Sequence, residues 1–168
     1  PRAHVVGCST AGEIQDQHVF DESLVTTAVA FSSTTVREAM VTIGTGEPSR
    51  DVGRRLAARL DPQGLIHVLV LSEGLNVNGS ELVAGITETL PANATVSGGL
   101  SADGARFQST RVILDGPPRT GVVVAIGFYG TSLRVAFGSF GGWDSFGPER
   151  LITRSEGNVL YELDGRSA

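Results

Sequence analysis

A glycine-rich loop near the start of the chain holds the first residues that could do chemistry. Residues 7–13 (GCSTAGE) bring a thiol, two hydroxyls and a carboxylate together. A G-x-x-x-x-G spacing is present, but Glu13 stands where a phosphate-binding loop needs Lys, and its charge would repel phosphate. A nucleophile elbow would centre on Ser9, but Ala11 replaces its second glycine and the loop leads into a strand-like run. The loop is therefore typical of neither motif.

An enzyme that uses this loop is an alternative interpretation. Its nucleophile would be Cys8 or Ser9, and its acid or base would be Glu13, Glu73 or Asp103. A single cysteine at the end of a buried strand is, however, more often a small apolar residue than a reactive thiol. We therefore expect no catalytic residues and no enzyme activity.

The three histidines show no spacing typical of a metal site. His4 and His67 each lie inside a strand-like run, where a hydrogen-bonded structural histidine is the usual case, and His18 is isolated. The single cysteine excludes an internal disulfide, a C-x-x-C redox pair and a cysteine-rich zinc site. We expect no metal ligands.

Length and composition exclude further classes of function. The chain has 168 residues, the size of one domain, and a net charge of −5, which disfavours binding to nucleic acid. All 13 basic residues are Arg, so the chain offers no phosphate-loop or Schiff-base lysine. No apolar run approaches the ~18 residues of a membrane span, so we expect no membrane insertion and a cytoplasmic location.

Hydrophobic patterning predicts two helices. Val52, Leu56 and Leu60 recur at helical spacing, with Ser49 able to cap the start and Asp61-Pro62 to end the helix. The second helix begins at Asn78, which has capping-box spacing to Glu81, and ends near Leu90. Short apolar or β-branched runs predict the strands, at residues 3–8, 24–31, 36–43, 65–71, 94–99, 107–114, 121–129 and 133–138.

The chain also contains an internal similarity. Three pairs of segments are similar, and they occur in the same order along the chain. The pairs are 3–12 with 94–103, 28–31 with 125–128, and 41–44 with 135–138. We expect an α+β fold built from a duplicated strand-helix-strand meander unit, with mixed, mostly antiparallel sheets and helices packed on the outer faces. Two sheets are our first choice and one large twisted sheet the alternative. The first copy would lack its opening strand and helix, which predicts an unpaired sheet edge.

In both copies a buried strand ends in glycine and small hydroxyl residues. Such turns leave backbone N–H groups accessible, and ligands favour the carboxyl ends of strands. The polar groups suit a small ligand with an amine or several hydroxyls better than a phosphate. Alternatively, the glycines only permit tight turns, and the domain is structural. The predicted ligand-binding residues are Cys8, Ser9, Thr10, Glu13, Glu73, Asn76, Gly98, Gly99, Ser101 and Asp103.

Three motifs make the chain similar to a known family. They are residues 5–14 (VVGCSTAGEI), residues 96–103 (VSGGLSAD) with Phe107 and Thr110, and residues 147–168. On these motifs the chain resembles the FIST family, a sensory domain of bacterial, archaeal and eukaryotic signal-transduction proteins. The resemblance implies an N-type sensory domain over residues 1–146 and, over 147–168, the junction to a C-terminal FIST half that lies outside this chain.

The resemblance also implies a function. FIST domains are intracellular, non-catalytic sensors that bind small ligands such as amino acids. The implied partners are the small molecule, the C-terminal FIST half and a signalling output protein such as a histidine kinase or receptor. Some relatives are haem-dependent nitric oxide sensors, which is an alternative here. Because none of the three histidines lies in a motif that matches a haem ligand, we expect no cofactor.

Overall fold

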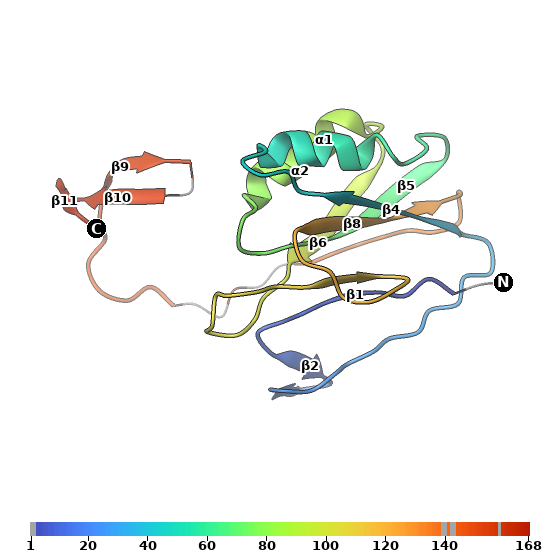
Figure 1. The fold of residues 1–168 in the computed structure, drawn as a ribbon, viewed down its shortest axis with the longest axis horizontal. Coiled ribbons are helices and arrows are strands. Elements are labelled where there is room, and N and C mark those ends of the chain that lie inside the picture. The colour runs from blue at the N-terminus through green and yellow to red at the C-terminus, as the bar shows by residue number, and fades with distance from the viewer. Residues whose placement is uncertain (1–2, 139–140, 142–143, 158) are drawn as a thin grey trace. The chain divides into compact units, whose positions relative to one another are not determined.

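The chain folds into two units in a computed structural model that describes residues 3–138, 141, 144–157 and 159–168 (Figure 1). The first unit spans Pro1–Val135 and the second Ala136–Ala168. The described residues contain two helices and eleven strands in mixed and antiparallel sheets. This confirms the predicted α+β class. The predicted boundary after residue 146 concerns the halves of the family and stays a prediction.

A four-stranded sheet forms the centre of the first unit (Figure 1). Its order is β4 (Thr35–Thr42), β8 (Val122–Tyr129), β5 (Leu65–Ser72) and β6 (Thr95–Leu100). β8 runs antiparallel to both neighbours, whereas β5 and β6 are parallel. Parallel neighbours need a crossover connection, and α2 (Gly79–Thr89) supplies it. The carboxyl ends of β5 and β6 therefore meet beside the start of α2.

Both helices cover one face of this sheet. α1 (Ser49–Ala57) crosses α2 at two glycines, Gly53 and Gly85. A Cβ atom added to Gly85 would stand 1.9 Å from the carbonyl oxygen of Arg50, and one added to Gly53 would stand 2.3 Å from that of Leu82. The two helix backbones are therefore in direct contact. Neither described helix is long and apolar enough to cross a membrane.

A smaller sheet lies against the other face. It pairs β1 (Val6–Cys8) with β7 (Val112–Leu114) in antiparallel register. The apolar cluster between the two sheets is small, and its buried members are Val112, Val122 and Val124. The helices thus lie on one face only, and strands cover the second face.

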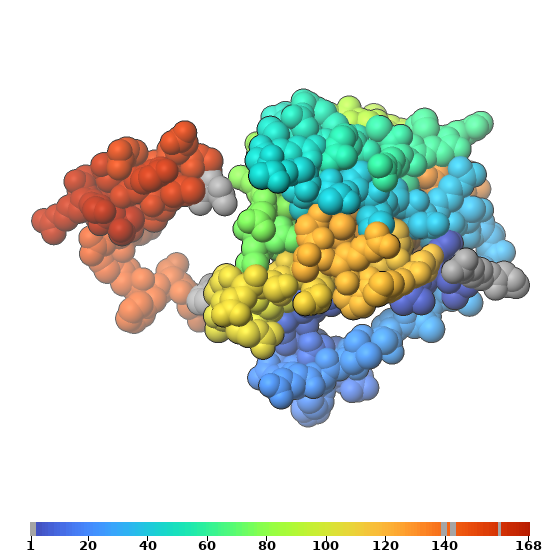
Figure 2. Space-filling model, in the orientation of Figure 1, coloured from blue at the N-terminus to red at the C-terminus, as the bar shows by residue number. Residues whose placement is uncertain are grey.

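A short hairpin follows β1. It joins β2 (Glu13–Gln15) to β3 (His18–Phe20) through a tight turn in which Asp16 has a φ of 54°. In Figure 2 this hairpin and the chain that follows it, in blue, form the outer margin of the first unit. Ile14 and Val19 are exposed there, so the hairpin contributes little to the core.

The helix ends agree only in part with the predictions. Asn78 caps α2, because its side chain accepts a hydrogen bond from the Glu81 N–H at 3.1 Å, as predicted. Ser49 does not cap α1, because Pro48 occupies the cap position and Ser49 is already helical. The Ser49 hydroxyl instead accepts the Asn78 N–H at 3.0 Å, which links the starts of the two helices.

Two predicted strands are wrong. Residues 24–31 and 133–138 form no strand, and only the last three residues of the predicted strand 107–114 do, as β7. A run of β-branched residues forms a strand only where another strand lies beside it and can pair with it. Within the described chain these two runs have no such partner.

The structure does not show the duplication. Residues 125–128 lie in β8, whereas their match 28–31 forms no strand, and 41–44 overlap β4, whereas their match 135–138 forms none. No described strand pairs with the outer edges of β4 and β6. Every open sheet has two unpaired edges. The edges seen here therefore do not test the prediction that the first copy lacks its opening strand.

The second unit is a three-stranded antiparallel meander. Its strands are β9 (Ile152–Glu156), β10 (Val159–Leu163) and β11 (Arg166–Ser167), with β10 in the middle. Arg154 lies 4.9 Å from the centre of the Tyr161 ring and contacts a carboxylate of β10 at 3.2 Å. These contacts lie at the surface, and the unit encloses no buried apolar cluster among its described residues.

Candidate ligand site

The predicted ligand-binding residues lie in three loops, at residues 8–13, 72–78 and 98–103, and these loops meet at one end of the central sheet. The Ala102 N–H donates to the Ser9 carbonyl at 2.9 Å, which joins the loop after β6 to the loop after β1. The N–H and the hydroxyl of Ser101 both donate to the Ser72 carbonyl, each at 2.8 Å. The loops at residues 8–13, 72–78 and 98–103 are therefore packed against one another.

Glu73 is the buried carboxylate at this junction, with 4% of its surface exposed. It accepts the N–H groups of Leu75 and Asn76 at 2.8 and 2.9 Å, and the Asn76 amide at 3.2 Å. The Thr110 hydroxyl donates to it at 3.4 Å and itself accepts the Gly74 N–H at 3.0 Å. The carboxylate thus holds the turn after β5 and ties it to the start of β7.

Asp103 has a similar structural role in the next loop. Its buried carboxylate accepts three backbone N–H groups, from Phe107, Gln108 and Ser109, at 2.8–3.0 Å. The bonds from Ser109 and Gln108 hold the pKa of this carboxyl below its usual range, so it stays ionised. The loop before β7 is folded around this one side chain.

The hydroxyl and carboxyl groups of the first loop also bond within the chain. Ser9 Oγ accepts the Arg111 N–H at 2.9 Å. Thr10 donates to Glu13, which also accepts the Ser23 hydroxyl at 2.8 Å. The bonds from Thr10 and then Ser23 lower the pKa of Glu13. These contacts anchor the base of the β2–β3 hairpin.

The described contacts do not support a nucleophile here. Burial raises the pKa of the Cys8 thiol, so the neutral, less reactive form prevails. Among the described residues, no hydrogen bond joins Cys8 or Ser9 to a histidine or a carboxylate. An activated nucleophile needs such a base within reach.

His67 is a structural histidine. It lies on β5, where its Nδ1 is 2.7 Å from Thr95 Oγ1 and its Nε2 is 2.9 Å from Ser97 Oγ, both on β6. Its ring packs 5.9 Å from that of Phe128. Burial lowers its pKa, so the ring is neutral. Both ring nitrogens are engaged within the sheet, which does not favour a haem-ligand role.

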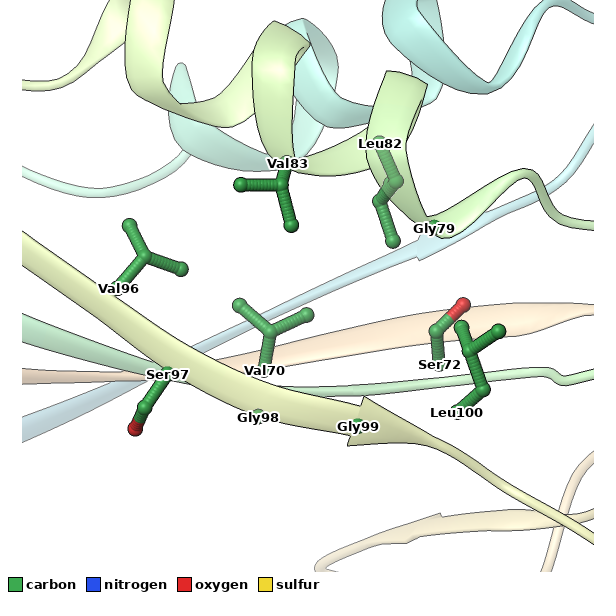
Figure 3. A pocket seen from close by; sticks show the side chains of 10 residues that line it. All are labelled: Val70, Ser72, Gly79, Leu82, Val83, Val96, Ser97, Gly98, Gly99 and Leu100. Carbon is green, nitrogen blue, oxygen red and sulfur yellow. The ribbon is translucent and has the colours of Figure 1, made fainter. Parts of the chain in front are cut away.

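A pocket of about 320 Å³ opens between α2 and the carboxyl ends of β5 and β6. Figure 3 shows Val83 and Leu82 of the helix facing Val70 and Val96 of the strands across this space. The pocket is lined by Val70, Ser72, Gly79, Leu82, Val83, Val96, Ser97, Gly98, Gly99 and Leu100. Its walls are mainly apolar, and the start of α2 lies at one end.

The two predicted glycines of β6 have different reasons to be glycine. Gly98 has a φ of +152°, and a Cβ there would stand 1.9 Å from the Val70 carbonyl oxygen. The neighbouring strand therefore requires it, independently of any ligand. A Cβ on Gly99 would meet no atom within 4 Å. At Gly99 the pocket wall is open backbone.

A second, more polar pocket of about 450 Å³ is lined by Glu73 and Asn76 of the β5–α2 loop, together with residues 43–47 and Gly121. Glu47 is held there by the Gly44 N–H and by Arg55, which lower its pKa. The segment from Ser72 to Gly79 thus contributes residues to both pockets.

The predicted site residues are divided between these places. Gly98 and Gly99 line the apolar pocket, and Glu73 and Asn76 line the polar one. The sequence does not predict the apolar walls as a site, although Val83 of α2 is 46% exposed. The residues that line neither pocket are Cys8, Ser9, Thr10, Glu13, Ser101 and Asp103.

The fold and the pocket define a small α+β domain with a ligand-sized cavity at the end of a βαβ unit. The family model of the FIST N domain matches residues 1–166, and the chain belongs to the FIST family. FIST domains are small-ligand sensory domains of signalling proteins and are not known as enzymes. A comparison with curated proteins found no match.

Proposed function

We propose that this FIST N domain senses an amino acid with an aliphatic side chain, which binds in the pocket between α2 and β6. The observation that carries the proposal is the pocket of about 320 Å³, with apolar walls and the start of a helix at one end. Ligand sites in α/β units favour this location, outside the carboxyl ends of parallel strands.

The apolar part of the pocket suits the side chain of the ligand. Leu82 and Val83 from α2 face Val70 and Val96 from the strands (Figure 3), and burial of apolar surface contributes about 25 cal/mol per Å². An aliphatic side chain matches these walls better than a charged one, because a charge there would lose its hydration.

The polar ends of the pocket suit an α-carboxylate and an α-ammonium group. Gly79 begins α2, and the first N–H groups of a helix attract carboxylates. β6 pairs only with β5 among the described strands, so backbone carbonyls on its outer edge are available to an ammonium group. A ligand there would bridge the helix and the edge strand.

The proposed output of binding is a change in how the domain contacts other parts of the signalling system. These would be its C-terminal FIST half or a signalling partner such as a histidine kinase or receptor.

The test is a binding screen with a variant that fills the pocket. Leucine, isoleucine and valine should raise the melting temperature of the protein, whereas glutamate and arginine should not, because ligands that bind the native state stabilise it. Val83→Trp should abolish this shift. Val19→Trp, at an exposed position that lines neither pocket, is the matched control and should keep it. A protein that responds to none of these amino acids in calorimetry would contradict the proposal.

A further inference from the structure

Three metal-ligating side chains converge at a place separate from both pockets. They are His4, Glu38 and Asp115, and their ligand atoms all lie within 4.8 Å of one another. His4 Nδ1 is 2.8 Å from Asp115 Oδ2 and 3.4 Å from Glu38 Oε2. We propose that these three residues bind a divalent transition-metal ion, Zn²⁺ in the first place.

The fold brings the three residues together from distant parts of the sequence. His4 precedes β1 and Asp115 follows β7, and the pairing of these strands places them side by side. The Asp115 N–H donates to the Val5 carbonyl at 2.9 Å, and the Val5 N–H donates to Asp115 Oδ1 at 2.7 Å. These bonds fix the carboxylate with Oδ2 beside His4. Glu38 approaches from β4.

The charges favour a cation at this place. Two carboxylates approach the same imidazole nitrogen, and one N–H cannot donate well to both. Like charges so close together raise each other's energy, and a cation between them removes this cost. A metal ion contacts all three donor atoms at once, whereas a proton on His4 Nδ1 serves one carboxylate at a time.

The distances are close to those of a zinc site. Zinc bonds to nitrogen and oxygen are about 2.0–2.2 Å, which in a tetrahedron sets the ligand atoms roughly 3.4 Å apart. The His4–Glu38 distance of 3.4 Å already fits, and the His4–Asp115 distance of 2.8 Å must open by about half an ångström.

The donor set and the exposure define the class of metal. One imidazole with two carboxylates favours a transition metal over Ca²⁺ or Mg²⁺, which prefer oxygen alone. The three side chains are 23–40% exposed, so solvent reaches the site. Three protein ligands leave a fourth position for water or another small ligand.

Calorimetric titration of the EDTA-treated, dialysed protein with Zn²⁺ tests the proposal. We expect one ion per chain and a higher melting temperature with Zn²⁺, because the ion would link β1 and β7 to β4. His4→Ala and Glu38→Gln should each weaken binding tenfold or more. Because the His4 and Glu38 side chains are partly exposed, circular dichroism of the two variants should show an intact fold.

Two control variants test whether residues outside the cluster bind the ion. His18→Ala removes an exposed histidine on β3, and Cys8→Ser removes the single thiol, so both variants should bind Zn²⁺ like the parent protein. The proposal is overturned if the parent protein takes up no Zn²⁺ at micromolar concentration, which would leave the cluster as an ion pair. It is equally overturned if His4→Ala and Glu38→Gln bind as tightly as the parent.

Discussion

The helix face of the central sheet and the end where its loops meet are held by different forces. On the helix face, fifteen buried residues of the described chain form one apolar cluster, and two glycines let α1 and α2 touch. At the loop end, Glu73, Asp103 and Thr110 accept hydrogen bonds from backbone N–H groups and so hold the connecting loops. The helix face depends on apolar packing, and the loop end depends on polar contacts.

The two regions should therefore be sensitive to different kinds of substitution. Apolar packing fails when volume is added or removed, because the interior is close-packed. Buried hydrogen bonds fail when a donor is left unpaired, even if the shape is kept. Both predicted site carboxylates that are buried, Glu73 and Asp103, belong to the second kind, so their presence in these loops does not by itself indicate a ligand.

The largest expected effect is on the helix face. Gly85→Ala should destabilise the protein by more than about 3 kcal/mol or prevent folding, because the new Cβ has no room beside the Arg50 backbone. An alanine at an unhindered helix position would instead stabilise by about 0.5–1 kcal/mol. Urea denaturation measures the difference. Gly99→Ala, where the Cβ meets open space, is the control and should change stability little.

The next largest effect is at the loop end. Glu73→Ala leaves the part-buried N–H groups of Leu75 and Asn76 without their acceptor, which should cost roughly 1–3 kcal/mol in total because water can reach them in part. Hydrogen exchange of residues 74–78 should accelerate much more than exchange of α1. Equal acceleration in both would show that the helix face and the loop end are not held separately.

A smaller effect is expected at Thr110. Thr110→Val keeps the shape but removes the acceptor of the Gly74 N–H, which should cost about 1–2 kcal/mol. Thr110→Ser keeps the hydroxyl and is the matched control. If the valine variant were as stable as the serine variant in urea, the hydrogen bond would not be what holds this loop.

The smallest effect concerns the surface of the helix pair. Glu88 of α2 accepts hydrogen bonds from Arg50 and Arg54 of α1, which lower its pKa to about 2. Because the folded pKa lies below the unfolded value of about 4.3, the ion pairs stabilise the fold above that pH and are lost as pH falls toward 2.

Thermal melts of Glu88→Gln between pH 5 and pH 2 test this interpretation. The parent melting temperature should fall more steeply than that of the variant over this range, because the variant has no carboxylate to protonate. Glu156→Gln, in the second unit, is the control and should follow the parent. Parallel curves for the parent and Glu88→Gln would contradict the assignment.

Several features of the fold could be predicted from short-range patterns. The apolar run at residues 65–71 and the run at 121–129 are the central strands β5 and β8, because strands covered on both faces have few polar positions. The Asn78–Glu81 spacing locates the start of α2. These patterns depend on residues that are close together in the sequence, so contacts with distant residues change the resulting local structure little.

Other features depend on contacts between distant residues. Residues 24–31 have the composition of a strand, but pairing needs a neighbour that composition does not reveal. The three loops that carry the predicted site residues meet at one end of the sheet, which the sequence does not reveal. That Glu73 and Asp103 accept N–H groups of their own loops depends on how each loop folds back, so residue types alone do not predict it.

The family, the α+β class and the positions of both helices can be predicted from the residues alone, because motifs, composition and periodicity are read along the chain. The folded chain was needed to see that an apolar pocket opens beside Gly99 and that His4, Glu38 and Asp115 meet. A cavity or a cluster of ligands is formed by side chains from separate elements, and sheet register and helix packing set the distances between them.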